Sequence, residues 1–155
     1  MDQRNRNGRL PHSVLIVEDS PLHARILRSL IPGEWEGSVE LLGANNLESA
    51  LEVASRKGPE CIILDLILPD ADGTVSLEAL QSVVPGVAIV VVSASRDPQV
   101  AMQVIAKGAH EFLSKWDFSS DELTTAITLA VARSQVSKAA PPPVPSPIRS
   151  AAADV

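Results

Sequence analysis

The sequence predicts an α/β fold in which helices cover both faces of one parallel, five-stranded sheet. Between residues 13 and 137, five short segments typical of strands alternate strictly with five segments of helical period. The segments at 13–17 and 87–92 are apolar and β-branched at almost every position, which is typical of strands buried on both faces. Because parallel strands need right-handed helical crossovers, this alternation predicts a doubly wound, three-layer α/β/α domain.

Each element has a local signal of its own. The predicted strands are residues 13–17, 38–42, 61–64, 87–92 and 110–114, and the predicted helices are residues 21–31, 47–57, 75–84, 98–107 and 121–137. Cap residues or prolines mark the helix starts, at Ser20–Pro21, Asn46, Asp97–Pro98 and Ser120. Glycines and prolines mark the ends, at Pro32–Gly33, Gly58–Pro59 and Gly108. In the fourth helix, Ala101, Val104 and Ile105 are expected to face the core.

Length and composition exclude several classes of protein. The 155 residues fit one domain, and with 45% apolar and 21% charged residues the chain can form a packed core. The single cysteine, Cys61, is expected in the core. One cysteine cannot form a disulfide within the chain, which is typical of proteins from a reducing compartment. The sequence holds neither a membrane-spanning apolar run nor a secretory signal, so we expect a cytoplasmic protein that does not enter a membrane.

Charge and proline divide the chain into three parts. The net charge is −6, with +2 on residues 1–12, +1 on residues 138–155 and −9 on residues 13–137. We expect a flexible basic arm over residues 1–12, a folded domain over 13–137 and a disordered Pro/Ala-rich tail over 138–155. Aromatic residues are only 3% of the chain, and the acidic body lacks a basic face, so direct nucleic-acid binding is not expected.

Polar residues follow four of the five predicted strands. Glu18 and Asp19 follow the first strand, Asp65 the third, Ser93 the fourth and Lys115 the fifth. In an open parallel sheet, ligands bind beyond the carboxyl ends of the strands, so these side chains are expected to converge. Crowded carboxylates repel one another, and a hard divalent cation such as Mg²⁺, or Mn²⁺, relieves that repulsion.

This residue set favours phosphoryl transfer to an aspartate. Asp65 is ionised at neutral pH and can attack phosphorus without a general base. Lys115 and the cation would clamp the phosphoryl oxygens, and Ser93 can donate a hydrogen bond to one of them. Each residue alone is unremarkable, and Asp70 and Asp72 are interpreted as loop residues beside a glycine.

Four segments carry a family resemblance. VLIVEDS (14–20), ILDLILPDADG (63–73), VVVSAS (90–95) and GAHEFLSK (108–115) resemble the receiver domain of bacterial two-component response regulators. The resemblance spans roughly residues 13–136. It implies a CheY-like, flavodoxin-like (βα)₅ fold and a phosphoryl group received from a sensor histidine kinase or a phosphotransfer protein.

The resemblance also implies a role for each matching residue. Asp65 would be the phosphoacceptor. The implied metal ligands are Glu18, Asp19, Asp65 and the backbone carbonyl of Ile67, and the implied phosphoryl-binding and switch residues are Ser93, Ala94, Lys115 and Phe112. Phosphorylation would draw Ser93 inward, the Phe112 ring would follow, and the face formed by the fourth helix, fifth strand and fifth helix would change its protein contacts.

Three positions depart from the commonest family pattern. Trp116 stands where proline is frequent, so we expect a trans bond before it; the ring is either a partner contact or a half-buried packing residue. Phe112 stands where tyrosine is frequent, so its switching must act by packing alone. Neither Ile67 nor Ser95 carries an acid or amide that could orient water, which predicts slow self-hydrolysis of the acyl phosphate.

Several functions remain open at this level. The favoured one is a phosphorylation switch, not a turnover enzyme, without an output domain of its own, acting on a downstream protein as a monomer or a phosphorylation-dependent homodimer. The alternatives are a docking scaffold that works without phosphorylation, the receiver part of a longer regulator, and an aspartate-dependent phosphatase. The phosphatase class typically carries a second aspartate two residues after the nucleophile, where this chain has Ile67.

Overall fold

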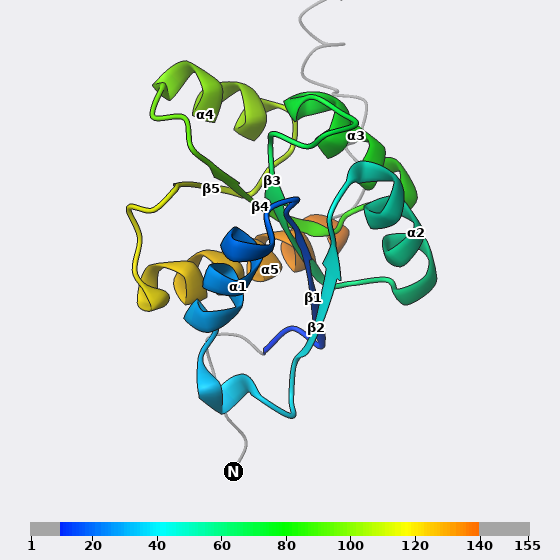
Figure 1. The fold of residues 1–155 in the computed structure, drawn as a ribbon. Coiled ribbons are helices and arrows are strands. Elements are labelled where there is room, and N and C mark those ends of the chain that lie inside the picture. The colour runs from blue at the N-terminus through cyan, green and yellow to red at the C-terminus, as the bar shows by residue number, and fades with distance from the viewer. Residues whose placement is uncertain (1–9, 140–155) are drawn as a thin grey trace, which may run out of the picture.

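A computed structural model describes residues 10–139 of the chain. In chain order the elements are β1 (Ser13–Val17), α1 (Pro21–Leu30), the 3₁₀ turn η1 (Gly33–Trp35), β2 (Glu40–Ala44), α2 (Leu47–Lys57), β3 (Cys61–Asp65), α3 (Gly73–Val83), β4 (Ala88–Ser93), α4 (Pro98–Ala106), β5 (Glu111–Ser114) and α5 (Ser120–Ala139) (Figure 1). The predicted alternation of strands and helices is confirmed.

The strands form one sheet in the order β2-β1-β3-β4-β5, and every neighbouring pair is parallel. The chain first moves outward from β1 to β2, and it then crosses back to the other side of β1 to form β3. This reversal between β1 and β3 is the point where open α/β sheets bind ligands. The doubly wound fold class predicted from the sequence is therefore correct.

Helices cover the two faces of the sheet as separate layers (Figure 1). In β1, Val14 and Ile16 pack toward α1 and α5, whereas Leu15 and Val17 pack toward α2, α3 and α4. All residues of β1, β3 and β4 are buried, which explains why these strands read as continuous apolar runs. Cys61 is fully buried in β3, as expected of a core residue, and burial raises the pKa of its thiol.

Most of the predicted helix boundaries are confirmed by hydrogen bonds. Ser20, Asn46 and Asp97 each accept a backbone N–H in the first turn of the following helix, and Gly58 ends α2 in the left-handed conformation. The cap of α5 is Ser119 and not the predicted Ser120. The Ser119 hydroxyl accepts from the backbone N–H of Glu122, whereas the Ser120 hydroxyl donates to the Leu30 carbonyl of α1. Two adjacent serines satisfy the cap pattern equally well, so the sequence could not separate them.

The start of β2, the start of α3 at Gly73 instead of residue 75, and the facing of one residue of α4 also differ from the prediction. Strand β2 begins at Glu40, two residues later than expected, because the N–H groups of Ser38 and Val39 both donate to the Trp35 carbonyl in a turn. In α4, Ile105 is 45% exposed although it was expected to face the core. Val104 takes the inward position, and its neighbour Ile105 lies about 100° further round the helix, which turns it toward solvent.

The ends of the described chain meet the folded body. Leu10 packs against the core on the α1 and α5 side, and the His12 N–H donates to Glu60 at 2.8 Å. Helix α5 continues to Ala139, two residues beyond the predicted boundary at 137. Of the predicted basic arm (1–12) and the predicted Pro/Ala-rich tail (138–155), residues 1–9 and 140–155 lie outside the described residues. Within residues 10–139, the helices are too short or too polar to cross a membrane.

Candidate functional site

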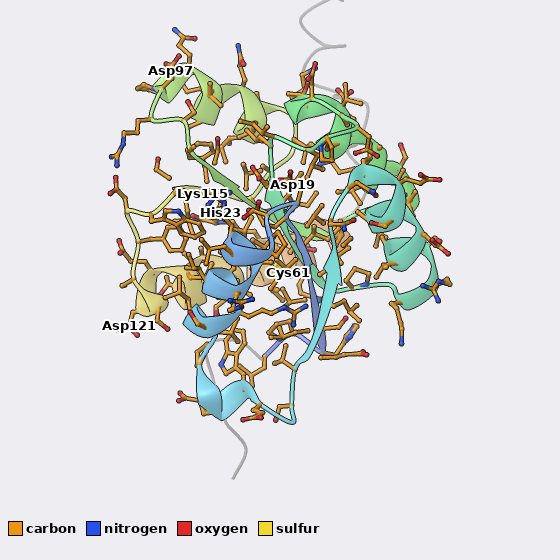
Figure 2. The ribbon with its side chains drawn as sticks, viewed as in Figure 1. Asp19, His23, Cys61, Asp97, Lys115 and Asp121 are labelled. Carbon is orange, nitrogen blue, oxygen red and sulfur yellow. The ribbon has the colours of Figure 1, made fainter. Side chains whose placement is uncertain are left out.

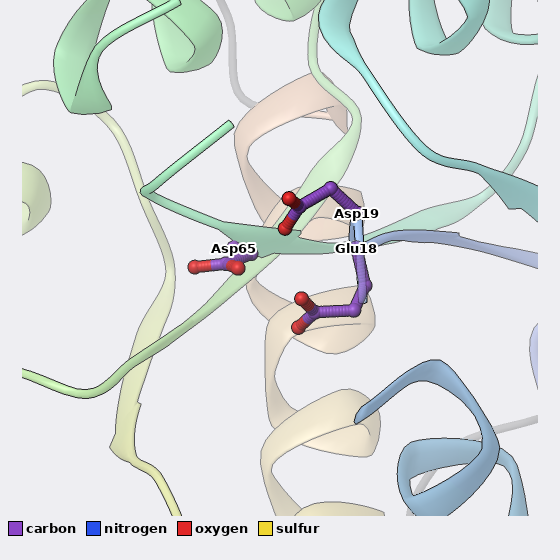
Figure 3. Close-up of side chains that lie close together, drawn as sticks. All are labelled: Glu18, Asp19 and Asp65. Atoms are coloured by element: carbon purple, nitrogen blue, oxygen red, sulfur yellow. The ribbon is translucent and has the colours of Figure 1, made fainter. Parts of the chain in front are cut away.

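Three carboxylates meet where β1 and β3 end (Figure 3). Val17 and Leu64 are partners in the register of these strands, so Glu18 and Asp65 both follow at the next position of neighbouring strands. Asp19 extends the group by one residue. One oxygen from each carboxylate lies within 4.8 Å of the others. The predicted convergence of Glu18, Asp19 and Asp65 is therefore present in the fold.

Burial differs among the three acids. Glu18 and Asp65 are 3% and 6% exposed, whereas Asp19 is open to solvent. Backbone N–H groups orient the two buried carboxylates: Ser20 donates to Glu18 at 3.3 Å, and Ile67 donates to Asp65 at 3.1 Å. Burial raises the pKa of Glu18, and the nearby Asp65 carboxylate adds to this rise.

Lys115 provides the opposite charge. It follows the last residue of β5, and its backbone N–H donates to the Ser93 carbonyl at 2.8 Å. Its ammonium reaches across the sheet edge and donates to Glu18 Oε1 at 2.6 Å and to Asp65 Oδ2 at 3.3 Å. The Lys115 side chain is only 6% exposed. The ammonium therefore opposes the rise in the Glu18 pKa that burial causes.

Ser93 and Ala94 lie at the end of β4, beside the strand that carries Asp65. Ser93 is 2% exposed, and its hydroxyl accepts a hydrogen bond from the Ser95 N–H at 3.1 Å. Ala94 is exposed. Phe112 in β5 is half-buried and packs against the core on the α2, α3 and α4 side. The hydroxyl and the ring therefore lie on neighbouring strands, and Phe112 pairs with Val91, two residues before Ser93.

The loop after Asp65 is held at both of its ends. Leu66 and Leu68 are each 7% exposed and join the core, while the Ile67 side chain between them is 69% exposed. Further along, the Asp70 carboxylate accepts the N–H groups of residues 47 and 48 at the start of α2. These hydrogen bonds lower the pKa of Asp70. Asp70 therefore anchors the loop to α2, and this is the structural role of the residue.

The peptide bond between Lys115 and Trp116 is cis, so the prediction of a trans bond is wrong. That prediction considered only the intrinsic preference of a bond that does not involve proline. In the folded chain, the Lys115 N–H is fixed to Ser93, and the indole contacts the rings of His23 and Phe118 with centroid distances of 5.2 and 6.0 Å. Tertiary contacts set the geometry of this loop. Trp116 is 37% exposed.

His23 also lies at the site, although it is not among the residues that the sequence predicted there. Its Nδ1 atom is 3.2 Å from the Lys115 ammonium and 3.8 Å from Glu18 Oε2 (Figure 2). A signal was present in the sequence: His23 is the third residue after the cap Ser20, in the first turn of α1. Side chains of a first turn lean toward the helix N-terminus, which here lies beside the end of β1.

The site is open to solvent on the side of α1 and α2. A cavity of about 440 Å³ lies beside the acids, and its lining includes Glu18, Asp19, Arg28, Asn45 and Ser49. Both the exposed Asp19 and the buried Glu18 line this cavity. Solvent and ions in this cavity can therefore reach Glu18 and Asp19 without opening the core, whereas Asp65 is not part of the lining.

The donor atoms fit a hard divalent cation. Within residues 10–139, the acids that could hold a metal together are Glu18, Asp19 and Asp65, and all three offer carboxylate oxygens. Oxygen ligands and a partly solvated position suit Mg²⁺, which keeps several of its waters.

Comparisons with known proteins agree with this geometry. Residues 14–128 match the family model described as response regulator receiver domain. The chain is 33% identical over 105 residues to the glycerol metabolism activator of Pseudomonas putida, covering 67% of this chain and 47% of that protein. It is 34% identical over 132 residues to the KDP operon transcriptional regulatory protein KdpE of Escherichia coli, covering 84% of this chain and 56% of that protein.

The chain thus spans about half the length of these curated relatives. Among solved structures, a CheY-like response regulator receiver domain protein of Methanospirillum hungatei superposes with a TM-score of 0.69. It is 21% identical and the match covers 81% of this chain and 97% of that one, which supports the fold alone. Together with the family match over most of the described residues, these findings show that the chain belongs to the response regulator receiver domain family.

Proposed function

We propose that this chain is a phosphorylation switch in which Asp65 accepts a phosphoryl group. Receiver domains receive phosphoryl groups from histidine kinases and bind Mg²⁺ at an acidic pocket. The observation that carries the proposal is the meeting of the Glu18, Asp19 and Asp65 carboxylates with the Lys115 ammonium at one edge of the sheet. A docking scaffold that works without phosphorylation would not need this arrangement of buried charge.

Mg²⁺, or Mn²⁺ in its place, would be held by Glu18, Asp19, Asp65 and the carbonyl of Ile67. When bound, the cation neutralises part of the charge on the transferred phosphoryl group. The chain's own residues do the remaining work. The N–H of Ile67 orients the Asp65 carboxylate, and the site's burial keeps that carboxylate in place before the donor arrives.

The transfer itself is an in-line displacement at phosphorus. A carboxylate oxygen of Asp65 forms the new P–O bond while the P–N bond of a phosphohistidine breaks, and the imidazole leaves with the electron pair of that bond. With acetyl phosphate as donor, the leaving group is acetate. Lys115 and the hydroxyl of Ser93 donate hydrogen bonds to the phosphoryl oxygens, with the N–H of Ala94 beside them.

Switching begins at Ser93. Its hydroxyl accepts from the Ser95 N–H, and turning toward a phosphoryl oxygen requires it to leave that partner. Phe112 then moves by packing alone, because it lacks a hydroxyl. The face formed by α4, β5 and α5 changes shape, and a downstream protein or a second copy of the chain that prefers the new shape is selected. Trp116 is a candidate contact for such a partner.

The acyl phosphate is expected to persist. Neither Ile67, with its exposed aliphatic side chain, nor Ser95 can act as an acid or base toward an attacking water. The chain would therefore store a phosphoryl group and not turn over a substrate as a phosphatase does.

The test is intact mass spectrometry after incubation with acetyl phosphate and Mg²⁺. Wild type is expected to gain the mass of one phosphoryl group, and Asp65→Asn to gain none. Asp72→Asn is a matched control, because this exposed loop aspartate caps α3 without a side-chain hydrogen bond and should be phosphorylated as wild type. Wild type without an adduct would favour the scaffold, and an adduct that survives Asp65→Asn would place the phosphoacceptor elsewhere.

A further inference from the structure

The ammonium of Lys115 has a third partner that the family resemblance does not supply. We propose that His23 is a positioning residue for Lys115, holding the ammonium at the site when a cation occupies the carboxylates. The inference deepens the proposed function and rests on it, because the ammonium is the group that meets the incoming phosphoryl oxygens.

The helix α1 fixes where His23 lies. The backbone N–H of His23 donates to the Ser20 hydroxyl, and the backbone N–H of Ser20 donates in turn to the Glu18 carboxylate. These two hydrogen bonds link the first turn of α1 to Glu18. The imidazole then reaches Lys115 with Nδ1 at 3.2 Å from Nζ (Figure 2). The His23 side chain is 37% exposed, so it lies at the mouth of the site and not beneath it.

The chemistry of the two groups defines the hydrogen bond. An ammonium has three N–H donors and no acceptor, so a hydrogen bond between the two groups makes His23 Nδ1 the acceptor and puts the ring proton on Nε2. Glu18 Oε1, Asp65 Oδ2 and His23 Nδ1 then give one acceptor for each of the three ammonium hydrogens. Two of these acceptors are carboxylates proposed as metal ligands, and the third is a neutral nitrogen.

This difference decides which partner remains after metal binding. A hard divalent cation competes with the ammonium for carboxylate oxygens, but a neutral imidazole nitrogen is a poor ligand for Mg²⁺. His23 is therefore the acceptor that Lys115 keeps while its hydrogens on Glu18 and Asp65 are released. The freed ammonium hydrogens can then donate to a phosphoryl group on Asp65, while the hydrogen bond to the imidazole keeps the Lys115 side chain at the site.

Neighbouring rings keep the imidazole in place. Trp116 meets His23 edge-on, with ring planes at 75°, and Phe118 packs behind Trp116. The Lys115 ammonium also lies 5.4 Å from the centroid of the Trp116 ring. The Trp116 and Phe118 rings limit rotation of the imidazole, so Nδ1 stays directed at the ammonium.

Two substitutions separate hydrogen bonding from packing. His23→Asn keeps an acceptor oxygen at the position of Nδ1 but loses the ring, whereas His23→Phe keeps a ring against Trp116 but loses the acceptor. With acetyl phosphate and Mg²⁺, the rate of adduct formation is expected to fall about tenfold in His23→Phe and to stay within about twofold of wild type in His23→Asn. A residue that acted only by packing would give the reverse order, which would overturn the proposal.

A second measurement does not depend on phosphorylation. In the full chain without donor, the ¹⁵N shift of His23 Nδ1 should be that of an unprotonated, hydrogen-bonded nitrogen, and it should move in Lys115→Met but not in Lys107→Met. If wild type forms no adduct, the proposed function fails, and this shift alone then decides whether His23 holds the ammonium. A His23 shift that ignores Lys115→Met refutes the inference whatever the phosphorylation assay gives.

Discussion

Replacing Lys115 with methionine removes the internal counter-ion of the site while keeping most of the side-chain volume. The ammonium lies 2.6 Å from Glu18 and 3.3 Å from Asp65, and both carboxylates are almost fully buried. Without it, two buried like charges face each other with no ammonium between them. We therefore expect Lys115→Met to fold with a lower free energy of unfolding when divalent cations are absent.

The magnitude follows from these distances. With an effective dielectric constant of about 20, the lost attractions are about 6 and about 5 kcal/mol, before the cost of desolvating the ammonium is subtracted. The carboxylate oxygens lie within 4.8 Å of each other, so their mutual repulsion is at least about 3.5 kcal/mol on the same scale. Because the buried ammonium no longer has to be desolvated, the net loss is expected to be about 3–5 kcal/mol, the usual cost of removing one partner from a buried pair.

Urea unfolding at neutral pH, with EDTA and then with Mg²⁺, measures this effect. Mg²⁺ should stabilise Lys115→Met more than wild type by at least about 1.4 kcal/mol, because no ammonium competes for the oxygens. Lys107→Met is the control: its partner Glu78 lies at 3.2 Å, but both side chains are about half exposed, so little stability should be lost. A loss below about 1 kcal/mol in Lys115→Met, or equal stabilisation of both chains by Mg²⁺, would refute the reasoning.

Three further outcomes are expected. Ile67→Asn should shorten the lifetime of the acyl phosphate about tenfold, because the amide can orient an attacking water. Mass spectrometry over time measures this lifetime, and an unchanged lifetime would contradict the explanation. His110 Nδ1 accepts the Ile89 N–H, and burial lowers the pKa of His110 below its ordinary 6.5. The free energy of unfolding should therefore fall as the pH drops below that value. His110→Asn, which keeps an acceptor but does not titrate, should make the free energy of unfolding less dependent on pH in this range. Asp70→Ala should accelerate amide exchange at the start of α2, where its carboxylate accepts two N–H groups, and unchanged exchange would deny the anchor.

The fold could be predicted because burial on both faces gives the strands an unmistakable composition. Strands β1, β3 and β4 are apolar at nearly every position, and the helices between them begin at cap residues that make the expected hydrogen bonds. The errors occur where two local solutions compete. Ser119 and Ser120 both suit a cap, and residues 38 and 39 were assigned to β2 although the turn after Trp35 uses their N–H groups.

The site could be predicted only as far as the sheet topology places strand ends together. Glu18, Asp65 and Lys115 follow strands whose order is a consequence of the fold class, so their meeting is a topological result. His23 and Trp116 meet because α1 and the loop after β5 approach each other in space. That approach depends on packing between side chains that are far apart in the chain, and the strand and helix patterns of the sequence do not specify it.

The charge count of the site explains why it can be both stable and responsive. With every group ionised, the three carboxylates and the one ammonium sum to −2, which is the charge that one divalent cation cancels. A phosphoryl group on Asp65 then brings new negative charge into a neutral site, and the Lys115 ammonium, which already contacts Asp65, can donate hydrogen bonds to it. The ammonium must change partners at each of these steps. A switch built this way needs one neutral acceptor that neither the cation nor the phosphoryl group displaces, and the imidazole of His23 is placed to be that acceptor.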